Sequence, residues 1–247
     1  MQITCITLFP DMIDAVKSGG VVGRAIERGV VNCTSVNPRE FTHDVHRTVD
    51  DRPYGGGPGM VMKAEPVLAA VNKARDQSAK GSRVVMMSPQ GARFDQAKAA
   101  EYARLPGLIL VAGRYEGIDE RVVTAGVDEE LSIGDYVLSG GELAAMVVID
   151  SVARLLPDVL GDSRSAQFDS FVDGLLDHPH YTRPEQLDGM AVPDVLVGGD
   201  HKKIENWRLK QALGRTWLRR PDLLDKRELN SQEKALLDEF IEEQGTR

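Results

Sequence analysis

Cysteine is scarce in this chain, whose 247 residues include only Cys5 and Cys33. Two such cysteines form neither a disulfide framework nor a Cys-x-x-Cys metal pair, and they favour a reducing, cytoplasmic compartment. Long apolar runs are also missing: residues 108–112 and 143–149 are among the longest, whereas a membrane span needs roughly 20 residues. The first ten residues carry no basic stretch, so we expect no signal peptide and no membrane partner.

Several glycine signatures of nucleotide-binding proteins are absent. No Gly-x-Gly-x-x-Gly follows a predicted strand, which argues against a Rossmann dinucleotide site and the glycine loop of the commonest methyltransferases. The tract at 55–59 is Gly-Gly-Gly-Pro-Gly, but Met-Val-Met follows where a P-loop needs Gly-Lys-Ser/Thr. Histidines 43 and 46 and histidines 178 and 180 form close pairs without a cysteine or carboxylate at ligand spacing. We therefore predict no protein-bound metal.

The formal net charge is −8, which taken alone argues against a polyanionic partner. The charge is unevenly spread, because residues 201–227 hold nine basic and three acidic side chains together with both tryptophans, Trp207 and Trp217. One interpretation of this basic window is a solvated helix face with two core tryptophans. The other is a surface that contacts nucleic-acid phosphates, which clustered Lys and Arg side chains bind.

Apolar runs and helical stretches alternate along the first two-thirds of the chain, which predicts an α/β domain. We expect strands at 2–8, 83–87 and 108–112, the last two buried on both faces of a sheet, and a helix at 94–105. Ser139 and Glu142 have capping-box spacing ahead of a helix at 143–156, which is apolar almost all round and should be buried.

Residues 158–179 are rich in Gly, Asp and Ser, and we interpret them as a mobile linker at a domain boundary. The predicted organisation is an α/β domain at 1–160, a flexible linker at 161–175 and a small all-helical domain at 176–247. Within the last domain, helix starts are expected at the capping box 182–185, at Asp200 and at residues 230–233. The helix that begins at Asp200 is expected to end at Gly214.

Three glycine-bearing turns stand out, at 88–91, 113–117 and 132–142. Turns at the carboxyl ends of parallel strands converge on one crevice, and glycines there let the backbone approach a ligand. Glycine turns also follow strands in α/β proteins that bind nothing there. The turns alone therefore favour a small-ligand site only slightly.

Four sequence blocks go further than these patterns: Asp51–Met60, Ser88-Pro-Gln-Gly91, Gly113-Arg-Tyr-Glu-Gly-Ile-Asp-Glu-Arg121 and Ser132–Glu142. Together with the segment at 178–183 and with Trp207–Pro221, they closely resemble the bacterial tRNA (guanine-N1)-methyltransferases of the trefoil-knotted SPOUT class. The match runs in order along nearly the whole chain. The resemblance implies a trefoil-knotted α/β domain with a parallel sheet flanked by helices, followed by a helical tRNA-binding domain.

The resemblance further implies a homodimer that uses S-adenosylmethionine to methylate N1 of the guanosine immediately 3′ to the tRNA anticodon, with tRNA rather than DNA as partner. It places the methyl donor among residues of the three turns. These are Ser88, Pro89, Gln90, Gly113, Tyr115, Glu116, Ile133, Gly134, Asp135, Tyr136, Val137, Leu138, Gly140 and Gly141.

By the same resemblance, Asp169 is the general base that removes the N1 proton, and Arg154 stabilises the charge that develops on the guanine oxygen. Glu116 is expected to hold the base or a magnesium ion, a further cofactor that the resemblance raises. Without the resemblance, Arg154 would pair with Asp150 at i,i+4 and Asp169 would be a solvated charge. Two other functions remain open: a SPOUT methyltransferase acting on ribose or ribosomal RNA, and a non-catalytic RNA-binding dimer.

Overall fold

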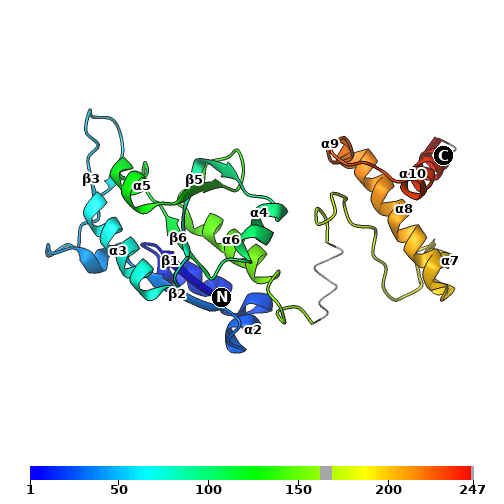
Figure 1. Cartoon of the computed structure of the whole chain (residues 1–247), viewed down its shortest axis with the longest axis horizontal. Helices are drawn as coiled ribbons and strands as arrows, with labels where there is room; N and C mark the ends of the chain where they lie inside the picture. The colour runs from blue at the N-terminus through cyan, green and yellow to red at the C-terminus, as the bar shows by residue number, and fades with distance from the viewer. Residues whose placement is uncertain (162–168, 246–247) are drawn as a thin grey trace. The chain divides into compact units, whose positions relative to one another are not determined.

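The computed structural model describes residues 1–161 and 169–245 and divides the chain into two compact units, Met1–Ser163 and Arg164–Arg247 (Figure 1). Seven residues of the predicted linker, 162–168, lie outside the described residues. In the described part of the chain, no helix is long and apolar enough to cross a membrane.

The first unit is built on a five-stranded parallel sheet with strand order β2-β1-β6-β5-β7. Its strands are β1 (Gln2–Ile6), β2 (Asn32–Val36), β5 (Arg83–Arg93), β6 (Gly107–Ala112) and β7 (Glu129–Ser132). A separate two-stranded ladder joins β3 (Asp50–Asp51) to β4 (Val61–Met62). The α/β class and the parallel sheet are therefore confirmed.

Helices cover both faces of this sheet. Seven helical segments belong to the unit: α1 (Pro10–Lys17), α2 (Gly20–Glu27), the 3-10 turn η1 (Pro38–Phe41), α3 (Ala64–Gln77), α4 (Gln96–Tyr102), α5 (Glu120–Gly126) and α6 (Glu142–Ala153). α1, α2, α4 and α6 share one apolar cluster, and α3 and α5 share the other. Alternate residues of β6 enter the two clusters, Leu108 and Leu110 one and Ile109 and Val111 the other. The strand is thus buried on both faces, as predicted.

Two details of α6 differ from expectation. Its N-cap is Gly141 rather than Ser139, with no side-chain cap, because the Glu142 carboxylate is engaged elsewhere. The helix is not buried all round: Leu143 and Val147 are 47% and 44% exposed. These two residues are four apart and share the face that points away from the apolar cluster.

The second unit holds α7 (Asp194–Val197), α8 (His201–Arg219), α9 (Pro221–Leu224) and α10 (Ser231–Gly245). α8 packs on α10, with Leu213 and Phe240 buried between them. Asp200 caps α8, since its side chain accepts the Lys203 amide at 3.2 Å, as predicted. The predicted stop at Gly214 is wrong: a Cβ at Gly214 would lie 2.3 Å from the Phe240 ring, so the glycine admits α10 rather than ending α8.

The expectation of an all-helical second domain also needs correction. Residues 182–185 start no helix, and β8 (Gln186–Leu187) pairs antiparallel with β9 (Met190–Ala191) instead. The turn between them is Asp188-Gly189, with φ of +50° and +79°. Asp-Gly is the pair that favours a two-residue hairpin turn with both residues at positive φ. The predicted helix start at 230–233 is confirmed, and it forms a capping box in which the Asn230 and Glu233 side chains each accept the other's backbone amide at 2.9 Å.

Candidate functional site

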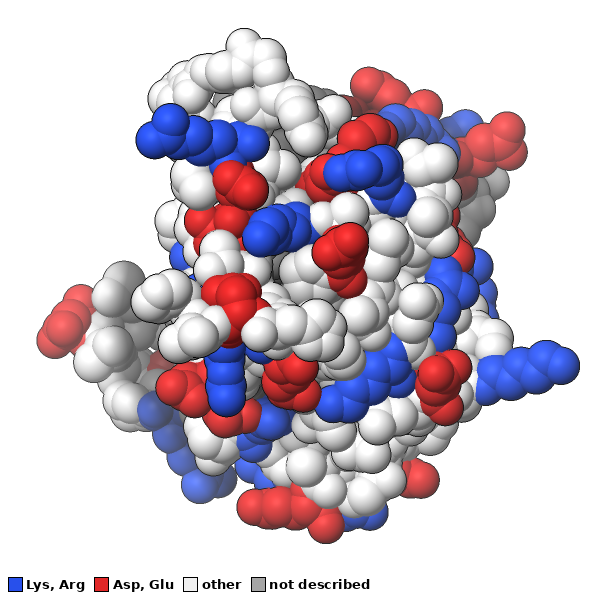
Figure 2. All heavy atoms as spheres, turned by 90° about the vertical axis from the view of Figure 1, so that its left-hand side faces the viewer, with Lys and Arg blue, Asp and Glu red and all other residues white. Residues whose placement is uncertain are grey.

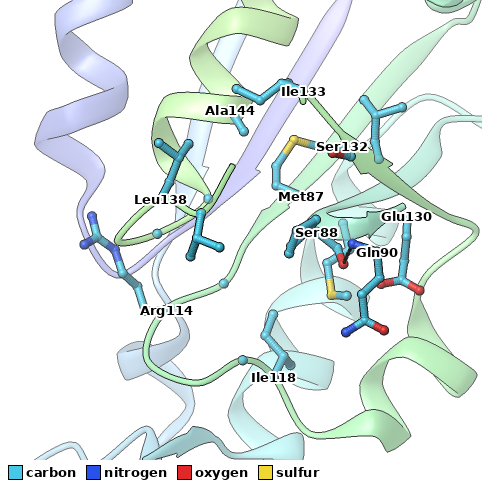
Figure 3. Close-up of a pocket in the computed structure, with 18 of the residues that line it drawn as sticks. Met87, Ser88, Gln90, Arg114, Ile118, Glu130, Ser132, Ile133, Leu138 and Ala144 are labelled. Carbon is cyan, nitrogen blue, oxygen red and sulfur yellow. Dashed lines mark hydrogen bonds between the residues drawn. The ribbon is translucent and has the colours of Figure 1, made fainter. Parts of the chain in front are cut away.

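One cavity of about 330 Å³ lies in the first unit, where the three glycine-bearing turns meet (Figure 3). The turns come from the distal part of β5, from the loop between β6 and α5, and from the loop between β7 and α6. Thirteen of the fourteen predicted donor-site residues line it; Asp135 does not and is exposed. The sheet order explains the convergence, because β5 lies between β6 and β7 and parallel strands end at the same edge.

The turn at 88–91 is an excursion within β5, which is longer than the predicted strand. Met87 and Ala92 both pair with Leu131, so the four intervening residues bulge out of the ladder. A Cβ on Gly91 would lie 2.2 Å from the Leu131 amide nitrogen, and only glycine lets β7 pass this close. Ser88 Oγ accepts the Gln90 amide at 3.2 Å, which holds the bulge in a compact turn.

The turn after β6 is held against the β4 strand. The Glu116 amide donates to the Met60 carbonyl at 2.9 Å, and the Met62 amide donates to the Gly117 carbonyl at 2.9 Å. Tyr115 has a φ of +62°, an uncommon conformation for a residue with a side chain. A Cβ on Gly59 would lie 2.3 Å from Glu116 Oε1, so the glycine tract comes close to the Glu116 carboxylate. The tract that resembled a phosphate loop thus packs beside the cavity wall.

The third turn is held by Arg114, which lies at the opposite end of the cavity from Gln90 and Glu130 (Figure 3). Its Nε donates to Glu142 Oε2 at 2.9 Å, and its Nη1 donates to the Ser139 carbonyl at 3.2 Å. The fully buried Glu142 also accepts the Thr7 hydroxyl at 2.8 Å. A Cβ on Gly140 would lie 2.2 Å from Arg114 Nε. Arg114 therefore fixes the end of the turn to the first strand and to α6.

Sequence reasoning missed several cavity residues, among them Ile118, Glu130 and Ala144. Glu130 lies on β7, beside Ser88 and Gln90 (Figure 3), and nothing in its local sequence marks it. Ile118 lies inside the block Gly113–Arg121, so that motif was the available signal.

The predicted catalytic residues fall in different parts of the chain. Glu116 lines the cavity. Arg154 is the C-cap of α6, where its amide donates to the Asp150 carbonyl at 3.2 Å, and it is not among the residues that line the cavity. Asp169 belongs to the second unit, where its carbonyl accepts the Val172 amide at 3.3 Å.

The basic window forms α8, α9 and the segment that follows, and ion pairs divide its charges into two groups. Lys210 is buried and bonded to Glu239 and Glu243 at 2.7 and 2.8 Å. Arg220 makes a two-pronged pair with Asp222, and Arg227 pairs with Glu233. Within the part of the chain that the structure describes, no ion pair engages Lys202, Arg208, Arg215, Arg219 or Lys226.

Three of these cations are aligned along α8. Arg208, Arg215 and Arg219 are spaced seven and four residues apart, which places them on one helix face. Figure 2, by contrast, shows acidic and basic side chains interspersed on the face of the first unit that carries β3 and α3. Among the described residues, Arg208, Arg215 and Arg219 thus align on one face of α8 without a carboxylate partner.

The family model described as tRNA (Guanine-1)-methyltransferase TrmD matches residues 1–226. Two curated relatives bear the name tRNA (guanine-N(1)-)-methyltransferase. That of Methylococcus capsulatus is 60% identical over 243 residues, covering 98% of this chain and 97% of the relative. That of Nitrosococcus oceani is 61% identical over 243 residues, covering 98% of this chain and 96% of the relative.

Proposed function

Since the chain belongs to the tRNA (guanine-1)-methyltransferase family, we propose that it transfers a methyl group from S-adenosylmethionine to N1 of the guanosine immediately 3′ to the tRNA anticodon. The observation that carries this proposal is the convergence of the three motif turns on one cavity of the first unit. The enzyme class and the tRNA substrate follow from the family. The position of the methylated guanosine is our inference from the resemblance.

The cavity has the features that S-adenosylmethionine requires. Ile133, Leu138 and Ala144 provide apolar walls, and Ser88 and Gln90 provide hydrogen-bonding groups at one end (Figure 3). The wall glycines Gly140 and Gly141 have no room for a Cβ, so backbone rather than side chains faces the ligand there. Bound there, the donor supplies an electrophilic methyl group on a positively charged sulfur.

The residues of this chain then have to remove one proton and stabilise one developing negative charge. N1 of guanine carries a hydrogen, so it must lose a proton as it attacks a methyl group, and we assign that proton to the Asp169 carboxylate. Loss of the proton places negative charge on the guanine oxygen, and we assign its stabilisation to the Arg154 guanidinium. Glu116, at the cavity wall, positions the base. Alignment of the nucleophile with the methyl group supplies further acceleration.

Magnesium receives no role in this mechanism. Among the described residues, the only group of three potential metal ligands is Asp177, His178 and His180, and imidazoles do not suit magnesium, which prefers oxygen ligands. No step is assigned to the ion, and a role of Glu116 in holding it stays a prediction.

We propose that α8 grips the tRNA through Arg208, Arg215 and Arg219. Their alignment without carboxylate partners among the described residues supports phosphate contacts over a solvated face.

We also propose a homodimer, which would cover the exposed Leu143 and Val147 on α6. The trefoil knot of the first unit and the cytoplasmic location remain inferences from the resemblance and from the tRNA substrate.

Mass spectrometry of a tRNA transcript treated with enzyme and S-adenosylmethionine tests the function. We expect one methyl group on the base of the guanosine 3′ to the anticodon. A methyl on ribose, or methylation of ribosomal RNA only, would support the alternative SPOUT function. Absence of S-adenosylmethionine binding in calorimetry would support a non-catalytic RNA-binding dimer.

Asp169→Ala tests the assignment of the general base. This variant should bind donor and tRNA normally while single-turnover methyl transfer collapses; near-normal transfer would refute the base assignment.

A further inference from the structure

A cluster of three potential metal ligands lies in the second unit, away from any role assigned so far. Asp177, His178 and His180 each offer one ligand atom, and these atoms lie within 4.8 Å of one another. His180 Nε2 is 2.8 Å from Asp177 Oδ2, and His178 Nε2 is 3.8 Å from Asp177 Oδ1. The prediction of no metal rested on the absence of a carboxylate near the histidine pair, and it overlooked Asp177.

A tetrahedral ion requires its ligand atoms to lie close together. Ligand atoms about 2.0–2.2 Å from a zinc ion at tetrahedral angles are roughly 3.3–3.6 Å apart. The two measured separations involve different oxygens of Asp177, because His180 Nε2 lies 2.8 Å from Oδ2 and His178 Nε2 lies 3.8 Å from Oδ1. Binding therefore requires side-chain rotations that bring both nitrogens to this spacing from one oxygen, and it replaces the His180–Asp177 hydrogen bond by two metal bonds.

The surroundings already orient two of the ligands. His178 Nδ1 is 3.3 Å from the Pro179 carbonyl oxygen; the tautomer with the proton on Nδ1 donates there and leaves the Nε2 lone pair facing Asp177. Histidine ligands in metal sites typically donate their other ring proton to such an acceptor. The Asp177 carboxylate is also held, because its Oδ1 accepts the His178 amide at 2.7 Å.

We propose that Asp177, His178 and His180 bind a zinc ion, with water as the fourth ligand. Two imidazoles and one carboxylate are a donor set that suits Zn²⁺. The His180 side chain is 72% exposed, so one side of the cluster is open to solvent for the water. This assignment is independent of the proposed methyl transfer, since no cavity residue takes part.

An ion bound at this site should stabilise the chain around it. The Asp177 amide donates to Ser170 Oγ at 2.9 Å, and the Leu176 amide donates to Thr216 Oγ1 on α8 at 2.8 Å. The hydrogen bond between Asp177 and Ser170 closes residues 170–177 into a loop that begins one residue after Asp169. An ion bound to Asp177 should therefore stabilise this loop. Zinc should slow amide hydrogen exchange across 170–180, with little effect on β1 or β6.

Calorimetry on full-length, tag-free, chelator-treated protein tests the site with Zn²⁺ as the probe. We expect one zinc ion per chain and an affinity at least about tenfold weaker in His180→Ala, because each ligand is needed to complete the coordination shell. His180 is exposed, so its removal should leave the circular dichroism spectrum unchanged. Asp177→Asn is the second variant, and it removes charge with little change in shape.

The matched control is His43→Ala/His46→Ala, which removes the other close histidine pair, also exposed. A second readout uses Trp207, whose ring centroid is 6.5 Å from that of His178. In Trp217→Phe, which leaves Trp207 as the only tryptophan, Co²⁺ should quench fluorescence, and excess Zn²⁺ should reverse the quenching. Equal zinc affinity in wild type and His180→Ala, loss of binding in the control alone, or no binding by the wild type would each overturn the proposal.

Discussion

The pair between Arg114 and Glu142 offers the sharpest test of how the cavity is held, and Glu142→Gln is the perturbation. Glu142 has no exposed surface, and its two oxygens accept one hydrogen bond each, from Thr7 at 2.8 Å and from Arg114 at 2.9 Å. The amide keeps the shape and removes the charge. Hydrogen bonds to charged groups contribute about 1.5–3 kcal/mol, and neutral ones about 0.5–1.5 kcal/mol.

The expected loss is therefore about 1–3 kcal/mol of unfolding free energy, out of the roughly 5–15 kcal/mol typical of a domain. The Arg114 side chain is 17% exposed, so solvent partly compensates its charge and keeps the loss below that of a fully buried broken pair. Because Arg114 also holds the Ser139 carbonyl, S-adenosylmethionine should bind more weakly, by about tenfold.

Urea unfolding and donor calorimetry measure the two effects. Glu65→Gln is the matched control, because Glu65 lies in the first turn of α3 as Glu142 does in α6, yet it is exposed. Both variants therefore lose a favourable interaction with a helix dipole, but only Glu142→Gln also changes a buried ion pair. If Glu142→Gln unfolds within about 0.5 kcal/mol of the control and binds donor equally well, the pair does not hold the cavity.

Three further predictions concern packing, tRNA and thiol chemistry. Gly91→Ala should lose about 1–3 kcal/mol of unfolding free energy in urea because its Cβ would meet the backbone of β7, whereas Gly19→Ala, with open space around it, should be nearly neutral. Arg219→Gln should weaken tRNA binding and reduce its salt dependence in filter binding, and Arg220→Gln should do so less because Asp222 already pairs with Arg220; the opposite order would contradict the α8 interface. Burial raises the pKa of Cys33 to about 11, so at pH 8 roughly one thiol in a thousand is ionised and alkylation should be slow until pH nears 11 or the protein unfolds; rapid alkylation of native protein at pH 8 would contradict this.

Sequence patterns predicted the parts of the fold that depend on local chemistry. The buried strand at 108–112, the Asp200 cap and the helix start at 230–233 were correct because each depends on side chains only a few residues apart. Thirteen of the fourteen residues expected around the methyl donor line the cavity, and they come from three of the motif blocks. Asp135 is the exception, and the lining residues Glu130 and Ala144 lie outside the blocks.

Two of the errors came from contacts between residues distant in sequence. Ser139 does not cap α6, because Glu142 is taken by Thr7 and Arg114, which lie 135 and 28 residues away. Gly214 does not end α8, because it receives the Phe240 ring from α10. In both cases the local signal was present, and a contact with a residue distant in sequence accompanied a different outcome.

The sequence by itself determined the α/β class, the family and the identity of the turns that form the cavity, because motifs and periodicity are local properties of the chain. Only the tertiary structure decided which basic side chains are neutralised by ion pairs with distant carboxylates. It neutralises Lys210 with Glu239 and Glu243 of α10, and it leaves Arg208, Arg215 and Arg219 aligned on α8. The reason is physical: charge is fixed by composition, whereas pairing depends on distances of a few ångströms that only the folded chain sets.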